Sequence, residues 1–309
     1  MSFSAKQLLL GRNTWLILCL LAGLIFNGFS VSLRDYLVYI LGFLMTVSLT
    51  AFSLSDFRPF REVYLRMAGA VVLSYLVFGT LLVGVAFAVS PTDTDMVLGF
   101  VFIALAPPAV VIVPFASLLK ADVKYAVVGV MGGYLALLGI FPLTVIWALG
   151  ADHVNYTQLF SLVGFFLVLP FLISRLLVSG RTGEWVSRNR SLLINLSFSL
   201  IVYVVVGLNR DVIIGQMGEI LKPMAVLALV LFGGGWMVER TLRYRKVPAH
   251  TVKSLGLLFN VKNTGFSAVT ALALLNERAA LPSAALSVVL LVYLIWLSLR
   301  ERIFRGATN

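Results

Sequence analysis

A lysine stands in the middle of the apolar segment LLFNVKNTGFSAVTALALL, which spans residues 257–275. Two amides and a hydroxyl, those of Asn260, Asn263 and Thr264, lie within two positions of Lys262. A cation beside neutral hydrogen-bond donors suits the binding of an anion. A charge at the centre of a bilayer costs about 2.5–3.5 kcal/mol on insertion scales, so Lys262 requires a partner, an escape route or a function.

Carboxylates offer Lys262 no partner at this depth. All 13 Asp and Glu residues lie in predicted loops or at the ends of predicted spans. Three kinds of partner remain: backbone carbonyls freed by a broken helix, water, and an anionic substrate. Two interpretations therefore stay open. Either Lys262 serves substrate binding, or its ammonium group caps the carbonyl end of a half-helix.

The composition is that of a membrane protein. Apolar residues make up 60% of the 309 residues and charged residues 12%, with a mean hydropathy of +1.01, whereas a soluble domain carries about 25% charged residues. A membrane span needs about 20 mostly apolar residues. Ten stretches satisfy this requirement, at about 13–30, 36–54, 65–89, 96–119, 124–149, 159–178, 191–208, 220–238, 251–275 and 280–299. We therefore expect a single all-α polytopic membrane domain over residues 1–309, with ten transmembrane helices.

Basic residues are distributed unevenly between the two sides of the predicted spans. With the connections numbered one to nine, the termini and the even loops hold 19 of the 24 Lys and Arg residues. The odd loops hold only four, which are Arg34, Arg210, Lys222 and Arg278. This bias predicts that both termini are cytoplasmic, in the plasma (inner) membrane. We expect the basic excess to contact membrane lipid, and nucleic acid is not an expected partner.

The predicted spans recur at a nearly fixed offset. Span three begins near position 65 and span eight near position 220, and spans two and seven, which begin near 36 and 191, show the same shift. Because five spans per half is an odd number, the two halves would cross the membrane in opposite directions. The sequence therefore predicts two inverted five-helix repeats, at about 13–149 and 159–299, an architecture found in many secondary transporters.

Spans four and nine are predicted to be broken at matching positions. Pro107, Pro108 and Pro114 interrupt span four, because proline removes a backbone donor and clashes with the preceding turn. The corresponding depth of span nine carries Lys262 and, three residues later, Gly265. Paired helix breaks of this kind indicate a transporter's binding site. We expect the broken helices to cross there, shaped by the three prolines and Gly265, with helix N-termini directed at a central site.

Two segments carry a resemblance to a known family. The segment APPAVVIVPFASLLKADVKYAVV (106–128) has a proline-centred break, and VKNTGFSAVTALAL (261–274) is similar to the motif Glu-x-Gly-x-Gln-Asn-small-Gly. Both resemble the bile acid:sodium symporter family, which includes arsenite and organic-anion carriers. The resemblance implies ten helices in two inverted repeats of five, with helices four and nine unwound and crossing at the centre. It also implies transport of an organic anion.

The positions that would hold sodium in the family carry different residues here. The motif's glutamine falls on Lys262 and its glutamate on Leu258, while the helix-three glutamine falls on Ser74. The other hydroxyl and amide ligands fall on apolar residues, namely Ile112, Val113, Ala126 and Val130. Most oxygen ligands for sodium are therefore missing, and Pro108 stands where arsenite carriers have a cysteine. We interpret the ammonium group of Lys262 as a covalent replacement for the coupling sodium.

The sequence predicts a secondary transporter of a small organic anion that works by alternating access and without sodium. Proton symport, exchange and uniport all remain open as coupling modes. The candidate substrate-binding residues are Lys262, Asn263, Asn260, Thr264 and Ser74. Two alternatives stand beside this prediction: a sodium-coupled organic-anion or bile-acid symporter, and a membrane sensor or channel that does not act as a carrier.

The sequence carries no recognisable enzymatic motif. Its single cysteine, Cys19, lies inside the first predicted span, and its two histidines, His153 and His250, lie in separate loops. An HExxH motif, a serine-histidine arrangement and an intramembrane carboxylate pair are all missing. We therefore expect no enzyme, no cofactor and no metal site.

Overall fold

The computed structural model describes residues 12–51, 60–150, 155–178, 180–208, 210–215 and 217–306. Within these ranges every regular element is helical. In the described part of the chain, six helices are long and apolar enough to cross a membrane: Gly28–Leu49, Arg61–Val89, Val123–Leu149, Thr182–Leu208, Gly218–Tyr244 and Glu277–Leu297. The chain is thus a polytopic, all-α integral membrane protein.

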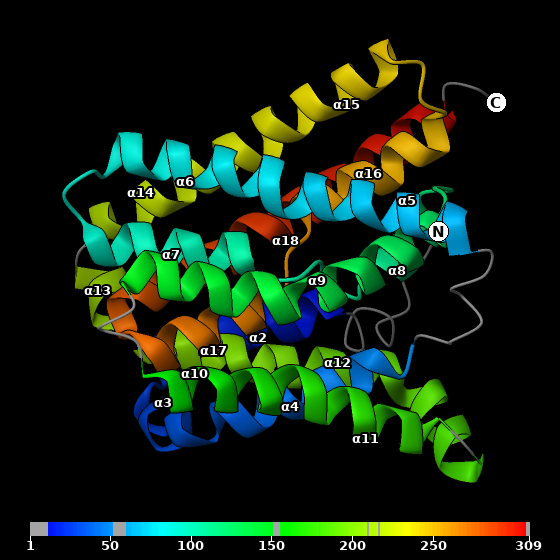
Figure 1. The fold of residues 1–309 in the computed structure, drawn as a ribbon. Helices are drawn as coiled ribbons and strands as arrows, with labels where there is room; N and C mark the ends of the chain where they lie inside the picture. Colours follow the sequence, from blue (N-terminus) through cyan, green and yellow to red (C-terminus); the bar gives the residue numbers. More distant parts are fainter. Residues whose placement is uncertain are drawn as a thin grey trace.

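One group of helices forms a layer around α12 (Gly180–Leu208). Its other members are α2 (Arg12–Ile25), α3 (Gly28–Leu33), η1 (Arg34–Tyr36), α4 (Leu37–Leu49), α10 (Tyr156–Val163), η5 (Gly164–Val168), α11 (Leu169–Leu177) and the short connecting helix α13 (Arg210–Gly215). The central helix α12 packs against α2, α3 and α4, and α11 packs against α4. Figure 1 shows these helices together on one side of the molecule. We call this group the α12 layer.

The remaining helices form a bundle, which we call the crossover bundle. Its members are α5 (Phe60–Val71), η3 (Val72–Val77), α6 (Phe78–Val89), α7 (Thr94–Leu105), α8 (Ile112–Leu118), α9 (Val123–Leu149), α14 (Met217–Ala228), η6 (Leu229–Gly234), α15 (Gly235–Tyr244), α16 (Ala249–Asn260), α17 (Thr264–Leu274) and α18 (Glu277–Gly306). In Figure 1 most of the bundle lies on the opposite side of the molecule from the α12 layer, while α17 lies at the boundary, next to α10. The two groups are joined where α12 packs against α17 and α18, and where α4 packs against α17.

Both predicted helix interruptions are present, at residues 106–111 and 261–263. Ala106 adopts an extended conformation, with φ −61° and ψ 138°, as expected of a residue that precedes proline. Pro107 and Pro108 follow, and neither has an N–H to continue the helical hydrogen bonds. The helix α7 therefore ends at this point.

The two breaks meet inside the crossover bundle, where they form an isolated antiparallel bridge. The N–H of Ala109 donates to the carbonyl of Val261 at 2.9 Å, and the N–H of Asn263 donates to the carbonyl of Pro107 at 2.8 Å. These bonds satisfy backbone groups that the broken helices leave free. They also fix the backbone of Lys262 at the crossing point.

Two residues expected to shape the crossover lie outside the breaks. Pro114 is the third residue of α8, where a missing N–H is tolerated because the first turn of a helix has no intrahelical acceptor for it. Pro114 therefore does not interrupt the span, which corrects the expectation. Gly265 is the second residue of α17. A Cβ at Gly265 would lie 3.3 Å from Ile201 of α12, so its small size serves helix packing.

The first two spans divide differently from the prediction. The helix α2 ends at Ile25, and Gly28–Leu49 is helical throughout and long enough for one span. Residues 28–30, which hydropathy assigns to the first span, therefore belong to the second. Hydropathy does not mark this boundary, because only Asn27 and Gly28 separate Phe26 from Phe29.

The helical elements and their contacts recur along the chain. The helices α7 and α16 have the same length, and each ends at one of the two breaks. The π-helical segments η3 and η6 also match in length, and each directly follows a 12-residue helix, α5 or α14. The packing recurs as well: α5 contacts α9 as α14 contacts α18, and α7 contacts α18 as α16 contacts α9. These features of the first half thus have counterparts in the second half.

Candidate functional site

The ammonium group of Lys262 lies at the crossing point, and the residue is only 1% exposed. Its Nζ donates to the carbonyl oxygen of Ser74 at 2.6 Å and to the Oγ of Ser74 at 2.8 Å. It also lies 3.2 Å from the carbonyl oxygen of Ala106 and 3.4 Å from that of Ala104. Ser74, which stands 188 positions away in the sequence, is thus in direct contact with Lys262.

Two backbone features make these carbonyls available. Ala104 and Ala106 lie at the C-terminal end of α7, where the last carbonyls have no helical partner and form the negative end of the helix dipole. Ser74 lies in the π-helical segment η3, and π-helical turns are frequent at functional sites. The break and the π-helix together present oxygens to a cation, and Lys262 supplies that cation. The ammonium therefore caps the carbonyl end of a half-helix, one of the two roles left open by the sequence.

Two aromatic rings complete the surroundings of the ammonium group. Its Nζ lies 4.6 Å from the ring centroid of Tyr75 and 4.8 Å from that of Phe78, at distances where a cation is attracted to a ring face. The hydroxyl of Tyr75 donates to the carbonyl of Gly133 at 2.8 Å and so fixes the ring. Within the described residues, no carboxylate forms an ion pair with Lys262. Acceptor oxygens and ring faces thus surround the amino group of Lys262, and no described carboxylate balances a charge on it.

A small cavity lies beside the crossover, between the α12 layer and the crossover bundle. Its volume is about 50 Å³. Its polar lining residues are Ser48 on α4, Asn195 on α12, and Lys262, Asn263 and Thr264 at the second break. Small-molecule sites usually measure about 300–1,000 Å³. An organic anion would therefore fit only after the two groups of helices separate.

Asn263 and Thr264 lie where α17 begins beside this cavity. Asn263 is the N-cap, and its Oδ1 accepts a hydrogen bond from the N–H of Phe266 at 3.0 Å. Its Nδ2 lies 3.8 Å from the Sδ of Met45 on α4. The side chain of Thr264 is buried, and its Oγ1 has no hydrogen-bond partner among the described residues. A hydroxyl in this place, beside a helix N-terminus and a cation, is available to a bound anion.

Asn260 points away from this group. Its Nδ2 donates to the hydroxyl of Tyr293 on α18 at 2.7 Å. It also packs against Gly235, where an added Cβ would lie 2.4 Å from that Nδ2. The structure therefore brings Ser74, Asn263 and Thr264 to the site of Lys262 but does not bring Asn260 there. Although Asn260 stands only two residues before Lys262, its side chain is directed at α18 and not at the crossover. The sequence alone does not reveal this direction.

Sequence reasoning does not single out Ser48 or Asn195. Ser48 is buried on α4, and Asn195 is half-buried on α12. Each is one of several polar residues in a mostly apolar span, without a helix break or a motif nearby. Their polarity within spans two and seven was the only signal that could have identified them.

Four of the positions that the resemblance matches to sodium ligands carry buried hydrocarbon side chains. Leu258, Ile112, Ala126 and Val130 are each 0% exposed, and none has a side-chain oxygen. In the described part of the chain, no group of three or more His, Cys, Asp or Glu residues could hold a metal ion. Among the described residues, Lys262, Ser74, Asn263 and Thr264 supply hydrogen-bonding side chains at the crossover.

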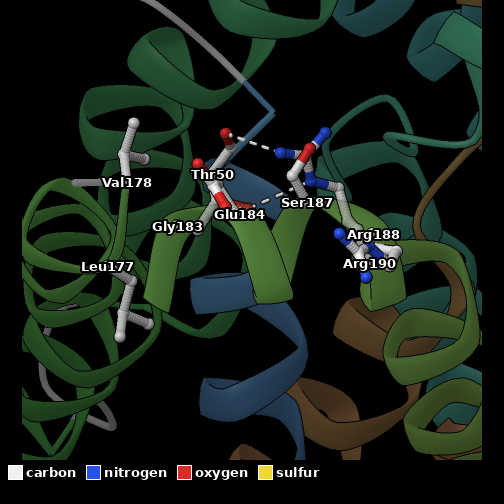
Figure 2. A pocket seen from close by; sticks show the side chains of 8 residues that line it. All are labelled: Thr50, Leu177, Val178, Gly183, Glu184, Ser187, Arg188 and Arg190. Carbon is white, nitrogen blue, oxygen red and sulfur yellow. Dashed lines mark hydrogen bonds between the residues drawn. The ribbon is translucent and has the colours of Figure 1, made fainter. Parts of the chain in front are cut away.

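A larger cavity, of about 650 Å³, lies within the α12 layer near the end of α4. Figure 2 shows its lining residues, with Arg190 extending toward Thr50. Arg190 donates to both the Oγ1 and the carbonyl oxygen of Thr50 at 3.1 Å, so it holds the end of α4 against α12. None of the described crossover residues lines this cavity. The cavity therefore belongs to the α12 layer rather than to the candidate site.

Comparisons with known proteins do not assign this site. No protein-family model and no curated protein sequence matches this chain. The relation to the bile acid:sodium symporter family therefore remains a proposal. It depends on segments 106–128 and 261–274 and on the geometry of the crossover.

Proposed function

We propose that this chain is a secondary transporter of a small organic anion, in which Lys262 supplies the positive charge that sodium supplies in sodium-coupled carriers of the bile acid:sodium symporter family. The observation that supports this proposal most is the buried, un-neutralised ammonium group at the junction of two broken helices. An intramembrane cation is expensive and is usually functional. Broken helices in matching positions commonly form the substrate site of a carrier.

The proposed architecture is ten transmembrane helices in two inverted five-helix repeats. It is supported by the equal lengths of α7 and α16, which both end at a break, and by the matching places of η3 and η6 after α5 and α14. The recurring helix contacts and the antiparallel bridge between the two breaks agree with it. A channel would need a continuous polar pore, whereas the cavity at the crossover is small and lies between closely packed helices. This arrangement favours a carrier.

A sodium-independent mechanism follows from what surrounds Lys262. Backbone carbonyls and a hydroxyl are ligands suited to a hard monovalent cation, and here the ammonium group occupies them. A sodium ion would have to displace a covalently attached charge from the same oxygens. We therefore place the sodium-coupled symporter second among the candidate functions. Uniport and exchange are compatible with a fixed ammonium group, whereas proton symport would require Lys262 to lose and regain a proton in each cycle.

The substrate would bind between the α12 layer and the crossover bundle. The polar groups of Asn195, Asn263 and Thr264 line the cavity there, and the charge of Lys262 lies beside it. In this conformation the N–H groups of Lys262 face protein oxygens. The ammonium group therefore attracts an anion through its electric field, and it contacts the anion directly only after it rearranges during opening. Because the cavity measures only about 50 Å³, the α12 layer and the crossover bundle must separate before substrate binds. Alternating access requires such a motion.

In the proposed orientation the protein lies in the plasma (inner) membrane, and both termini are in the cytoplasm. Arg34 and Glu277 form an ion pair at one end of the molecule. The helix α18 runs from this end to Arg300 at the other end. The basic bias of the loops assigns the Arg300 end to the cytoplasm. Impermeant cysteine labelling of Ser90→Cys and Ser187→Cys in intact cells tests this orientation. Labelling of the second variant alone would show the inverse orientation.

Flux into proteoliposomes tests the function itself. Small carboxylates, sulfonates and sulfates are first screened for thermal stabilisation of the purified protein, and the best is used as the labelled substrate. We expect saturable uptake that is stimulated by counter-transport and unchanged when potassium replaces sodium. Lys262→Ala should abolish uptake. Lys222→Ala, which removes an exposed lysine paired with Glu219 on α14, should retain it. Strict sodium dependence, or full uptake by Lys262→Ala, would contradict the proposal.

A further inference from the structure

A second cavity, of about 380 Å³, lies between α15, α16 and α18. We infer that it binds an anionic phospholipid of the surrounding membrane. Its charged lining residues are Glu239, Arg243, Lys253 and Arg300, and two tryptophans, Trp236 and Trp296, contribute to its apolar wall. The inference depends on the membrane location of the protein and not on the proposed transport function.

The charge at this cavity favours an anion. Three cations and one carboxylate line it, so their net charge is +2. Glu239 accepts hydrogen bonds from Arg300 at 3.0 and 3.1 Å and also from Arg243. A guanidinium group has five N–H donors, and Arg243 uses one nitrogen on Glu239 while its side chain is 58% exposed. Phosphate oxygens are the preferred acceptors of such a group.

The remaining lining selects a lipid over a free phosphate ion. Trp236 and Trp296 are 60% and 41% exposed, and tryptophan is enriched where a membrane meets water. Arg240 lies over the ring of Trp236 and Arg300 over that of Trp296, at 5.6 and 5.3 Å from the ring centroids. Beyond them the wall continues with apolar residues such as Phe232. A charged mouth above an apolar groove matches a headgroup phosphate with its acyl chain.

The position of the cavity agrees with this ligand. It lies at the end of the bundle that carries Arg240, Arg243 and Arg300. Basic pockets between membrane helices on the cytoplasmic side are suited to anionic headgroups. The deep end of the cavity reaches Tyr293, which holds Asn260 beside the crossover. A bound lipid would therefore stabilise α16 next to its break.

Thermal unfolding of the purified full-length protein tests the inference, since a ligand that binds the folded state raises the melting temperature. The probes are phosphatidylglycerol, phosphatidylcholine and inorganic phosphate, each added to delipidated protein in detergent. We expect phosphatidylglycerol to raise the Tm by several degrees and the other two to raise it by less than half as much. Equal stabilisation by phosphatidylcholine would show that the headgroup charge is not recognised. Equal stabilisation by inorganic phosphate would show that the acyl chain is not recognised.

Two pairs of variants locate the effect. Arg243→Gln should remove at least half of the phosphatidylglycerol shift, whereas Arg245→Gln, which loses the same charge outside the cavity lining, should keep it. Trp236→Ala should weaken the shift as well, whereas Trp185→Ala, an exposed tryptophan of the α12 layer, should not. Size-exclusion profiles establish that each variant is folded. Equal losses in the two arginine variants would overturn the inference, because they would indicate nonspecific attraction of lipid to a basic surface.

Discussion

Lys262 bonds to oxygens that belong to two different helices, so its removal affects the fold as well as the site. The carbonyls of Ser74 and Ala106 would lose their donor and remain buried. An unsatisfied buried polar group costs about 1–3 kcal/mol. Loss of activity in Lys262→Ala therefore needs a companion variant that keeps a donor while losing the charge.

Lys262→Gln provides that companion. Its amide has two N–H donors that can reach some of the same oxygens, so we expect a Tm closer to that of the unaltered protein than the Tm of Lys262→Ala. Anion uptake should nevertheless be lost, because the positive charge is gone. Sodium should not restore uptake, since Leu258 and Ala126 still supply no side-chain oxygen. Uptake near the original rate in Lys262→Gln would show that hydrogen bonding, and not charge, is what the site requires.

Thr264 gives a second prediction at the residue scale. Its Oγ1 is buried without a partner in the described part of the chain, so Thr264→Val should leave the Tm unchanged or raise it slightly. If the hydroxyl contacts the substrate, the same change should raise the KM for uptake about 5- to 150-fold, the equivalent of about 1–3 kcal/mol for a lost hydrogen bond.

Thr270→Val serves as the matched control. Its Oγ1 donates to the carbonyl of Phe266 at 2.6 Å within α17, so the variant should change the Tm without changing the KM. Identical KM values for the two valine variants and the unaltered protein would remove Thr264 from the substrate site.

At the scale of the elements, the crossover depends on close approach between α9 and the first break. A Cβ added to Gly133 of α9 would lie 2.4 Å from the Cδ of Pro108. Non-bonded carbon atoms do not approach each other this closely. The ring of Pro108 cannot move aside easily, because the bridge between the breaks holds it. The position of α9 thus limits where the two broken helices can meet.

Gly133→Ala should therefore displace the first break. We expect a loss of about 1–3 kcal/mol of stability, as for other overpacked core positions, and a large fall in uptake. The control is Gly139→Ala on the same helix, where no described atom lies within 4 Å of the added Cβ. This control should be neutral or slightly stabilising, because alanine favours a helix. A neutral Gly133→Ala, measured by thermal unfolding, would mean that the crossover is looser than its distances indicate.

At the scale of the whole molecule, contacts between the α12 layer and the crossover bundle close one end of the protein. Arg34 of η1 forms an ion pair with Glu277 of α18 at 2.7 Å. Nearby, the Nε2 of Gln158 on α10 donates to the carbonyl of Ala273 on α17 at 2.8 Å. The cavity at the crossover lies toward the opposite end, between Ser48 and Asn195. Opening of the closed end must break these two contacts.

Arg34→Ala should favour that opening. Because both partners are more than 40% exposed, the ion pair contributes about 0–1 kcal/mol, so the open population should rise by up to about fivefold. The measurement is the labelling rate of Thr264→Cys by an impermeant thiol reagent added outside, in a protein that also carries Cys19→Ser. Arg210→Ala is the control, because Arg210 bonds to the Leu24 carbonyl within the α12 layer. Equal labelling rates in the two variants would exclude the ion pair as a latch.

The sequence by itself determined the features that depend on local chemistry. Apolar runs dictate helices in a membrane, because the hydrocarbon leaves backbone groups no other partner. Consecutive prolines dictate the first break, since they lack the donors that a helix needs. A lysine among apolar residues signals a site for the same reason, because its charge must be compensated.

The tertiary structure decided which groups meet at that site. Hydropathy indicates the depth of a residue in the membrane but not the direction in which its side chain points around the helix. Packing therefore placed Ser74 against Lys262 across 188 positions and turned Asn260 toward Tyr293. It also brought Ser48 and Asn195 to the cavity from spans that carry no helix break or motif. Pro114 remained inside α8, because whether a proline breaks a helix depends on which turn it occupies.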